Sequence, residues 1–331
     1  MCRERTFVCQ PLPYTIYLYK ELKTVIKTIA STELPIGEQL MIRKNVIGYG
    51  GGKRLCIVTG THGDELEGQM VCYEMARRLG QDLRSLDGTV EIYPALNPLG
   101  IDTMMRGIPN FDLDMNRIFP GNPGGTMIEQ AAYAIVEDLK GADLVIDVHS
   151  SNIYLRETPQ VRINVNDEQR LVPIAQQMGI EFVWIHDAAT VLESTLAHSL
   201  NATGTPCLVV EMGVGLRINH KMCSRLVDGM FTLMAGMGMW HGDTGENTPP
   251  TPIVCKGDRV AFLNAEASGV FLTDLKCGVE VMPGDLVGEI VEPLTGTVLS
   301  RVVSPCHGFL FTIRAYPIVY EGSLMARIFI L

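Results

Sequence analysis

The chain has 331 residues, 47% of them hydrophobic and 7% aromatic, and its formal net charge is −10 at pH 7. This length allows one large and one small domain with a buried core, and the negative charge disfavours nucleic acid and anionic membrane surfaces as partners. No apolar run reaches the roughly 18 residues that a membrane helix needs, and the first residues lack the apolar segment of a signal peptide.

The cysteines indicate the compartment. Nine of them are scattered along the chain without a C-x-x-C pair, and several lie in apolar runs. This pattern is typical of reduced, mostly buried thiols and not of a disulfide framework or a Cys-type zinc site. We therefore expect a cytoplasmic protein.

The chain alternates strands and helices over most of its length. Residues 14–29 lack a clear period and predict a helix, or a strand and a helix, ahead of the first strand of a sheet. The predicted strands are then 55–59, 90–95, 144–148, 182–185 and 208–210, and the predicted helices lie near 67–80, 126–140, 168–178, 192–203 and 220–239. This alternation indicates an α/β fold with a largely parallel or mixed sheet, in which ligands bind beyond the carboxyl ends of the strands.

The amino-acid composition changes at the end of this region. Residues 241–252 are rich in turn formers, as a linker would be. Short β-prone runs separated by glycine and proline follow at 259–263, 270–273, 286–291, 297–303, 308–313 and 325–330. We expect a first domain over residues 1–245 and a small all-β domain, a sandwich or barrel, over residues 250–331.

The turn after the strand 55–59 carries the first metal-capable pair. Gly60 and Gly63 permit a tight turn into the following helix. His62 and Glu65, three residues apart across that turn, can then both bind one metal ion, such as zinc. In the alternative interpretation, a carboxylate of this turn caps the helix and His62 is a solvated turn histidine.

A second histidine lies at the end of another predicted strand. His149 follows the strand 144–148, and Asp147, two residues earlier, projects to the same face. A carboxylate in that position suits a ligating histidine whose other ring nitrogen is held by an acceptor. The alternative is a strand-end histidine that only hydrogen-bonds to Ser150 or Asp147.

A carboxylate, Glu211, follows the apolar strand 208–210 directly. Such a group is costly to bury unless it faces a cleft, a cation or water. The alternative is that Glu211 caps a turn or pairs with Arg217. Because three predicted strands each place a metal-capable or acid–base residue at the carboxyl end, we favour one shared site there.

Two arginines lie in a long loop punctuated by glycine and proline. Arginine forks suit carboxylate binding and the stabilisation of a developing oxyanion, which would be the role of Arg106 and Arg117 beside a metal site. Taken alone, the segment also fits surface pairing with Asp102, Asp112 or Asp114. The remaining histidines lack a partner at ligand spacing, and we expect surface or core residues at His186, His198, His220, His241 and His307.

Together these motifs resemble the succinylglutamate desuccinylase and aspartoacylase family, within the zinc carboxypeptidase-like superfamily. Their order and approximate spacing match over residues 54–215. The matching segments are Gly60-Thr61-His62-Gly63-Asp64-Glu65, Asn97-Pro98 followed by Arg106, Asp114-Met115-Asn116-Arg117 with Phe119-Pro120-Gly121, Asp147-Val148-His149 and Val210-Glu211-Met212-Gly213.

The resemblance implies a zinc-carboxypeptidase-like mixed sheet flanked by helices, with a small C-terminal β-domain. It implies a zinc-dependent deacylase that cleaves the amide bond of a small N-acyl amino acid by attack of a metal-bound water. The implied roles are one Zn²⁺ per chain on His62, Glu65 and His149, Glu211 as general base and then proton donor, Arg106 at the oxyanion, and Asn116 with Arg117 at the substrate carboxylate. The chemistry agrees, because three protein ligands leave an open zinc position for water.

The sequence departs from the family pattern at the substrate. Aspartoacylase-type members carry an arginine just before the glutamate strand and a tyrosine from the C-terminal domain, both for an acidic substrate. Residues 201–205 contain no arginine, and Tyr316 and Tyr320 are the candidates for the tyrosine. We therefore expect a different N-acyl amino acid, such as an acetylated diamino acid.

Two other functions fit the same residues. A zinc carboxypeptidase that acts on short peptides would share the metal site, and a catalytically inactive metal-binding sensor or scaffold would keep the ligands alone. The intact set of Glu211, Arg106 and Arg117 argues against the inactive protein. The sequence leaves the oligomeric state open, a homo-oligomer included.

Overall fold

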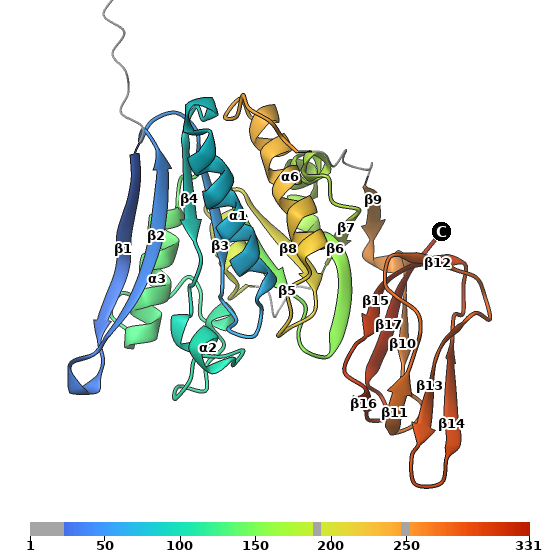
Figure 1. The fold of residues 1–331 in the computed structure, drawn as a ribbon. Coiled ribbons are helices and arrows are strands. Elements are labelled where there is room, and N and C mark those ends of the chain that lie inside the picture. Colours follow the sequence, from blue (N-terminus) through green and yellow to red (C-terminus); the bar gives the residue numbers. More distant parts are fainter. Residues whose placement is uncertain (1–22, 188–192, 246–251) are drawn as a thin grey trace, which may run out of the picture.

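The computed structural model describes residues 23–187, 193–245 and 252–331, and within them it shows a large mixed sheet flanked by helices and a smaller second sheet (Figure 1). This confirms the predicted α/β class. The helices are α1 (Glu67–Gln81), α2 (Pro98–Thr103), α3 (Met127–Leu139), α4 (Glu168–Ala175), α5 (Leu196–Ala202) and α6 (His220–Gly236).

The large sheet takes strands from both ends of the chain. Its order is β1-β2-β4-β3-β5-β8-β6-β15-β17-β10, with β7, β9 and β12 paired beside this path. The strands are β1 (Lys23–Glu33), β2 (Gln39–Gly48), β3 (Arg54–Thr59), β4 (Thr89–Tyr93), β5 (Leu144–Ser150), β6 (Leu155–Asn164), β7 (Phe182–His186), β8 (Cys207–Gly213), β9 (Ile253–Lys256), β10 (Val260–Asn264), β12 (Val279–Val281), β15 (Gly308–Arg314) and β17 (Leu324–Ile330).

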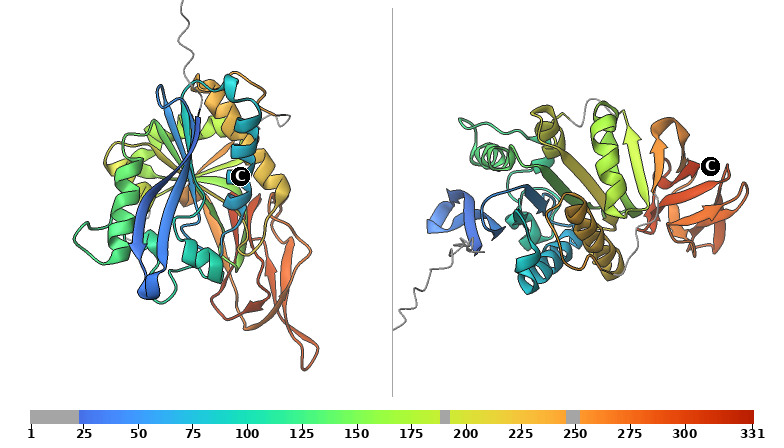
Figure 2. Two further views of the ribbon diagram at one scale, coloured as in Figure 1. Left: turned by 60° about the vertical axis from the view of Figure 1, so that its left-hand side comes forward. Right: turned by 90° about the horizontal axis from the view of Figure 1, so that it is seen from above.

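Helices cover both faces of the central strands, as Figure 2 shows. Leu55 and Ile57 of β3 point to the face covered by α1 and α6, where they join one buried cluster. Cys56 and Val58 point to the opposite face and pack with α3 and α5. A strand buried on both faces reads as a continuous apolar run, which is why residues 55–58 could be recognised in the sequence.

The parallel strands β4, β3, β5 and β8 bring their carboxyl ends to one edge. Thr59 of β3 lies opposite Val148 of β5, and His149 of β5 lies opposite Glu211 of β8. The helix α2, which follows β4, lies at the same lower end of the molecule in Figure 1. The groups that the sequence places at strand ends therefore meet at one edge of the sheet.

The other expectations for the first 245 residues hold to different degrees. The five strands predicted between residues 55 and 210 and the helices near 67–80, 126–140, 168–178 and 220–239 are present, with ends shifted by a few residues. Residues 23–29 belong to β1, so a helix there is wrong, and residues 14–22 lie outside the described residues. The helix predicted over residues 192–203 corresponds to α5, and residue 192 also lies outside the described residues. The sequence interpretation missed β1, β2 and β6. No helix in the described ranges is long and apolar enough to cross a membrane.

The C-terminal segment contains the β-strands predicted for it. Its second sheet has the order β14-β13-β11-β16, from Thr297–Val303, Leu286–Glu292, Gly269–Leu272 and Ile318–Val319. One apolar cluster joins this sheet to β10, β12, β15 and β17, so the two layers pack as a sandwich. Because β15 pairs with β6 and β9 pairs with β7, the central sheet continues into this segment. The domain boundary near residues 245–250 stays a prediction.

A buried ion cluster fixes the first strands to α3. Nζ of Lys44, on β2, lies 3.0 Å from the carboxylate of Glu91 on β4 and 2.7 Å from that of Asp138 on α3. Lys44 is only 5% exposed. Arg54 also contacts Glu91, and the Tyr93 hydroxyl lies within hydrogen-bonding distance of both carboxylates.

Replacing this lysine should therefore destabilise the protein strongly. Lys44→Met leaves Asp138 and part of Glu91 without their cation, and we expect the free energy of unfolding to fall by about 3 kcal/mol. Urea unfolding at pH 7 measures the change. Lys140→Ala, which removes only a surface pair with Glu137, should cost less than about 1 kcal/mol, and an equal effect of both substitutions would contradict the prediction.

Candidate metal centre and active site

The turn between β3 and α1 carries two of the predicted metal-capable side chains. Gly60 has φ +69°, a conformation that favours glycine. At Gly63, a Cβ atom would lie 1.9 Å from the backbone carbon of Gly100. The helix α1 begins after Leu66, and no side chain caps it. The interpretation in which a carboxylate of this turn caps the helix is therefore wrong.

Several nitrogen atoms lie within hydrogen-bonding distance of the Glu65 carboxylate. Nδ1 of His62 lies 2.7 Å from one of its oxygens, and Nδ1 of His149 lies 2.9 Å from the other. The backbone N–H of Ser150 and Nη1 of Arg106 donate to the same carboxylate, each at 3.1 Å. Ligand atoms of the two histidines and Glu65 all lie within 4.8 Å of one another. The structure thus brings together the three side chains predicted to hold a metal ion.

A second carboxylate faces the other ring nitrogen of each histidine. Nε2 of His62 lies 3.0 Å from Asp114, which precedes a short 3₁₀ turn, Met115–Arg117. Nε2 of His149 lies 3.1 Å from Asp147. Such carboxylates fix the orientation of ligating imidazoles and raise their basicity. The role of Asp147 follows from strand alternation, whereas Asp114, from a distant loop, could be found only in the folded chain.

The carboxylate of Glu65 and the neighbouring imidazoles each shift the pKa of the other toward the charged form. Burial alone would raise the pKa of Glu65, but the nearby His62 and His149 outweigh it and hold the pKa below its usual range. Burial lowers the pKa of His149, but Asp147 and Glu65 reverse this effect and raise it well above its usual value. The carboxylate therefore stays ionised between two imidazoles. A bound cation would take the place of protons on the two imidazoles.

This donor set fits a catalytic zinc ion. Two imidazoles and one carboxylate are a known ligand set for zinc in hydrolases, and they leave a coordination position open. All three residues are 3% exposed. A buried site of this composition, with a carboxylate behind each imidazole, has the second layer of contacts that metal centres need.

Arg106 and the residues after Asp114 border this cluster. Arg106 also lies 3.4 Å from Asp114, so the surface pairing considered for it is present, although the same side chain reaches Glu65. Asn116 accepts a hydrogen bond from the backbone N–H of Leu196. Arg117 is exposed and donates to its own neighbour, the carbonyl of Asn116. Among the described residues it has no carboxylate partner, which leaves donors free for a ligand.

Glu211 stands opposite His149 on the neighbouring strand. Its carboxylate accepts a hydrogen bond from Nη1 of Arg162 at 3.2 Å. Arg217, the partner considered from the sequence, donates instead to the carbonyl of Leu216, so that alternative is wrong. Burial raises the pKa of Glu211 to about 7, although Arg162 and His149 oppose this shift. A carboxyl group with this pKa can both accept and return a proton near neutral pH.

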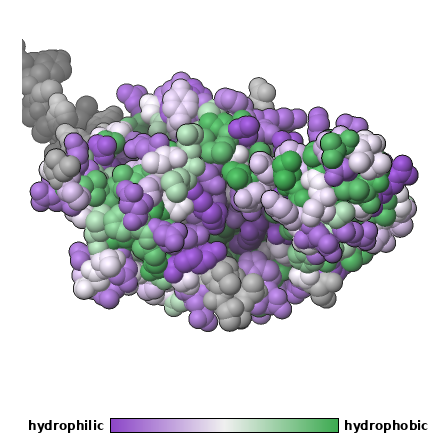
Figure 3. Space-filling view, turned by 90° about the horizontal axis from the view of Figure 1, so that it is seen from below, coloured by the Kyte–Doolittle hydropathy of each residue, from purple (hydrophilic) through white to green (hydrophobic). Residues whose placement is uncertain are grey.

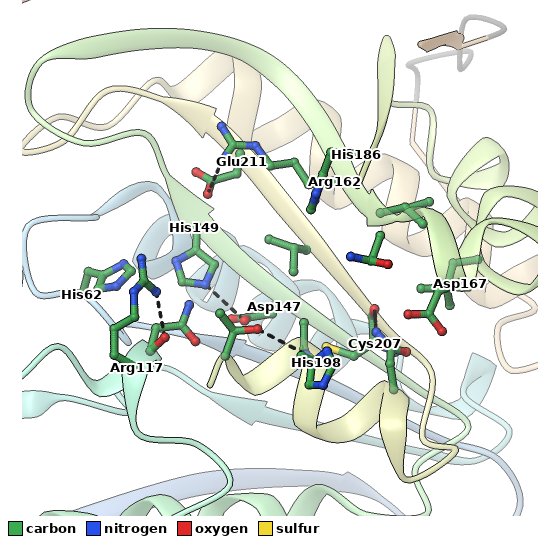
Figure 4. Close-up of a pocket in the computed structure, with 18 of the residues that line it drawn as sticks. His62, Arg117, Asp147, His149, Arg162, Asp167, His186, His198, Cys207 and Glu211 are labelled. Atoms are coloured by element: carbon green, nitrogen blue, oxygen red, sulfur yellow. Dashed lines mark hydrogen bonds and ion pairs between the residues drawn. The ribbon is translucent and has the colours of Figure 1, made fainter. Parts of the chain in front are cut away.

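A cavity of about 200 Å³ connects these groups. Figure 3 shows a hollow with hydrophilic walls near the middle of the lower face. In Figure 4, His62 and His149 lie at one end of the cavity and Asp167 at the other. His186 and His198 also line it, which the sequence interpretation did not foresee. The cavity brings together all seven predicted site residues except Glu65, which lies behind its wall.

The tight packing of the turn allows a test of the metal site. In Gly63→Ala the new methyl group meets the backbone of Gly100, which cannot yield as a flexible side chain would, so the turn must shift. We expect the metal content after loading with zinc to fall well below one ion per chain, as measured by plasma mass spectrometry. Gly80→Ala, in α1, is the matched control because its Cβ meets nothing within 4 Å. Equal zinc content in the two variants would contradict the prediction.

Comparisons with known proteins agree with this fold. The chain is 23% identical over 261 residues, 76% of this chain and 75% of the relative, to the N-alpha-acetyl-L-2,4-diaminobutyric acid deacetylase of Halomonas elongata. A succinylglutamate desuccinylase/aspartoacylase structure from Rhodobacter sphaeroides has a TM-score of 0.76 and 23% identity, covering 92% of this chain and 95% of that one. The product-bound ectoine utilisation protein EutE (DoeB) from Ruegeria pomeroyi has a TM-score of 0.79 and 20% identity, covering 94% and 95%.

The family itself follows from the sequence of residues 51–237. Residues 51–237 match the succinylglutamate desuccinylase/aspartoacylase catalytic domain. This range contains the metal-capable turn, the arginine loop and the strands that carry His149 and Glu211. The match spans more than half of the chain and confirms the resemblance stated from the motifs, so the chain belongs to the succinylglutamate desuccinylase/aspartoacylase family.

Proposed function

We propose that this protein is a zinc-dependent hydrolase that cleaves the amide bond of an N-acyl amino acid. The observation that carries the proposal is that the cluster of His62, Glu65 and His149 borders, through its two histidines, the same small cavity as Glu211. Membership of the family and the similarity to a curated deacetylase support it. One Zn²⁺ per chain would be held by the two imidazoles and the Glu65 carboxylate.

The reaction needs a base that later becomes an acid. A zinc ion held by His62, Glu65 and His149 would supply a water molecule of lowered pKa, about 7, and would polarise the amide carbonyl. Glu211 takes a proton from the attacking water and then donates it to the nitrogen of the leaving amine. Its place opposite His149, with the carboxylate turned to the cavity, suits both steps.

The arginines supply positive charge for the substrate. Arg106 lies against Glu65 and is 42% exposed at its side chain, so part of its fork can steady the oxyanion that forms when water attacks the acyl carbon and its carbonyl oxygen takes up the charge. Arg117, which has unused donors, would hold the carboxylate of the amino acid together with Asn116. Both residues line the cavity.

The size of the cavity favours a small substrate over a peptide. About 200 Å³ holds an acylated amino acid but not an extended chain. The carboxypeptidase alternative shares the metal ligands and needs a longer groove, so short peptides separate the two activities. Under the alternative of an inactive sensor or scaffold, a base beside an open metal position would serve no purpose.

Two substitutions test the roles of the ligands and of the base. Glu211→Gln should lower kcat about 100-fold or more while the zinc content stays at one per chain, because the amide cannot take up the proton. His62→Ala should lose both zinc and activity. His241→Ala, at an exposed histidine, is the control and should keep both. Zinc retained in full by His62→Ala, or full activity of Glu211→Gln, would refute the assignment.

A substrate panel tests the preference for the amino acid. We expect Nα-acetyl-2,4-diaminobutyrate to be cleaved with a higher kcat/KM than N-acetylaspartate or N-succinylglutamate. Residues 201–205 offer no arginine for a second carboxylate, and Asp167 lies at the end of the cavity away from His62 and His149. Amine release from each compound, with short peptides alongside, gives the measurement. Preference for an acidic substrate would contradict this expectation.

A further inference from the structure

A chain of four alternating charges runs from the cavity into the C-terminal segment. Arg162 donates to Glu211 through Nη1 at 3.2 Å and to both oxygens of Glu157 through Nη2 at 2.9 and 2.8 Å. Arg327 donates to Glu157 from the other side at 2.7 Å. The order of charges is therefore carboxylate, guanidinium, carboxylate, guanidinium.

The middle of this chain is closed to solvent. Glu157 is 1% exposed, and Thr312 of β15 adds a hydrogen bond to it at 3.3 Å. An isolated carboxylate at this depth would be costly, and its two arginines offset that cost. The position of Glu157 in turn fixes one side of the Arg162 fork, because Nη2 contacts both oxygens of this carboxylate while Nη1 contacts Glu211.

The guanidinium groups of Arg162 and Arg327 both pack against the aromatic ring of Trp184. Arg162 lies opposite Trp184 on the paired strand β7, and its guanidinium lies 5.5 Å from the ring centre. The guanidinium of Arg327 lies 5.4 Å from the same ring. These contacts leave Arg162 little freedom to turn, so the carboxylate of Glu211 meets a donor that is fixed before any substrate arrives.

We propose that Arg162 is a positioning residue for Glu211 and that the C-terminal segment sets its position through Glu157 and Arg327. The inference rests on the proposed function for the role of Glu211 as the base. Arg162 borders the cavity, whereas Arg327 stands behind it and is absent from the lining that the described residues form. A change at Arg327 therefore reaches the reaction through Glu157 and Trp184, which both contact Arg162, and not through contact with a ligand in the cavity.

Arg327→Gln gives the sharpest test of this coupling. Without its second cation, Glu157 draws Arg162 more strongly, and Glu211 loses part of its fixed donor. We expect kcat for the best N-acyl amino acid to fall about tenfold while KM stays within about twofold of wild type. Arg327→Lys, which keeps the charge, should recover most of kcat. A crystal structure of Arg327→Gln should show Arg162 moved away from Glu211.

A matched control separates this role from general support of the fold. Arg301→Gln removes an exposed arginine of the same segment, 3.0 Å from Glu289, and should change neither kcat nor KM. Unchanged kcat in Arg327→Gln, or a rise in KM with kcat retained, would overturn the proposal. So would an unaltered contact between Arg162 and Glu211 in the crystal structure of that variant.

Two further results keep the two proposals distinguishable. If Arg327→Gln does not fold, Arg162→Lys carries the test, because lysine keeps the charge but cannot contact Glu211 and Glu157 at the same time through a fork, and wild-type kcat in that variant would overturn the inference. A wild-type protein without deacylase activity would refute the proposed function. The crystal structures would still decide whether Arg327 controls the contact between Arg162 and Glu211.

Discussion

The buried carboxylate of Glu65 is the constraint on which the site depends. It is 3% exposed, and an ionised group at that depth is tolerated only when its oxygens are fully engaged. Donors reach it from the turn after β3, from the end of β5 and from the arginine loop. These parts of the chain lie far apart in sequence. The hydrogen bonds that they donate to the Glu65 carboxylate therefore fix how two strand ends and a loop meet.

Close packing lets the strand ends meet in this way. A Cβ atom at Gly68 would lie 1.8 Å from Oγ1 of Thr59, so α1 can approach β3 only with glycine there. The same hydroxyl donates to the carbonyl of Val148 at 2.8 Å and ties β3 to β5 just before His149. The small residues around the turn thus serve the metal-capable cluster as well as the backbone.

The parts that sequence could predict are those governed by local pattern. The apolar runs of β3, β5 and β8 are buried on both faces, and their ends carry His62, His149 and Glu211. The strand β2 does alternate, with Leu40 and Ile42 buried. Its third inward residue is Lys44, however, and a buried lysine hides the pattern because its partners come from β4 and α3.

The strand β6 escaped prediction for a different reason. Pro159 lies within it, and proline argues against an interior strand. The pairing of β6 with β8 shifts register between Glu157 and Gln160. Strict alternation would place residues 157 and 162 on opposite faces, so only this irregularity lets Glu157 and Arg162 meet. A contact created by a register shift leaves no periodic signal in the sequence.

The C-terminal segment is joined to the site by backbone as well as by charge. The first residues of β6 pair with β15, and its last residues pair with β7, which pairs with β9. The strand that carries Arg162 is therefore held at both ends by sheet contacts that include residues after 252. A C-terminal segment that only narrowed the cleft would need neither this continuous strand pairing nor the hydrogen bond from Arg327 to Glu157. Their combination supports the proposal that this segment helps to position Glu211, the proposed general base.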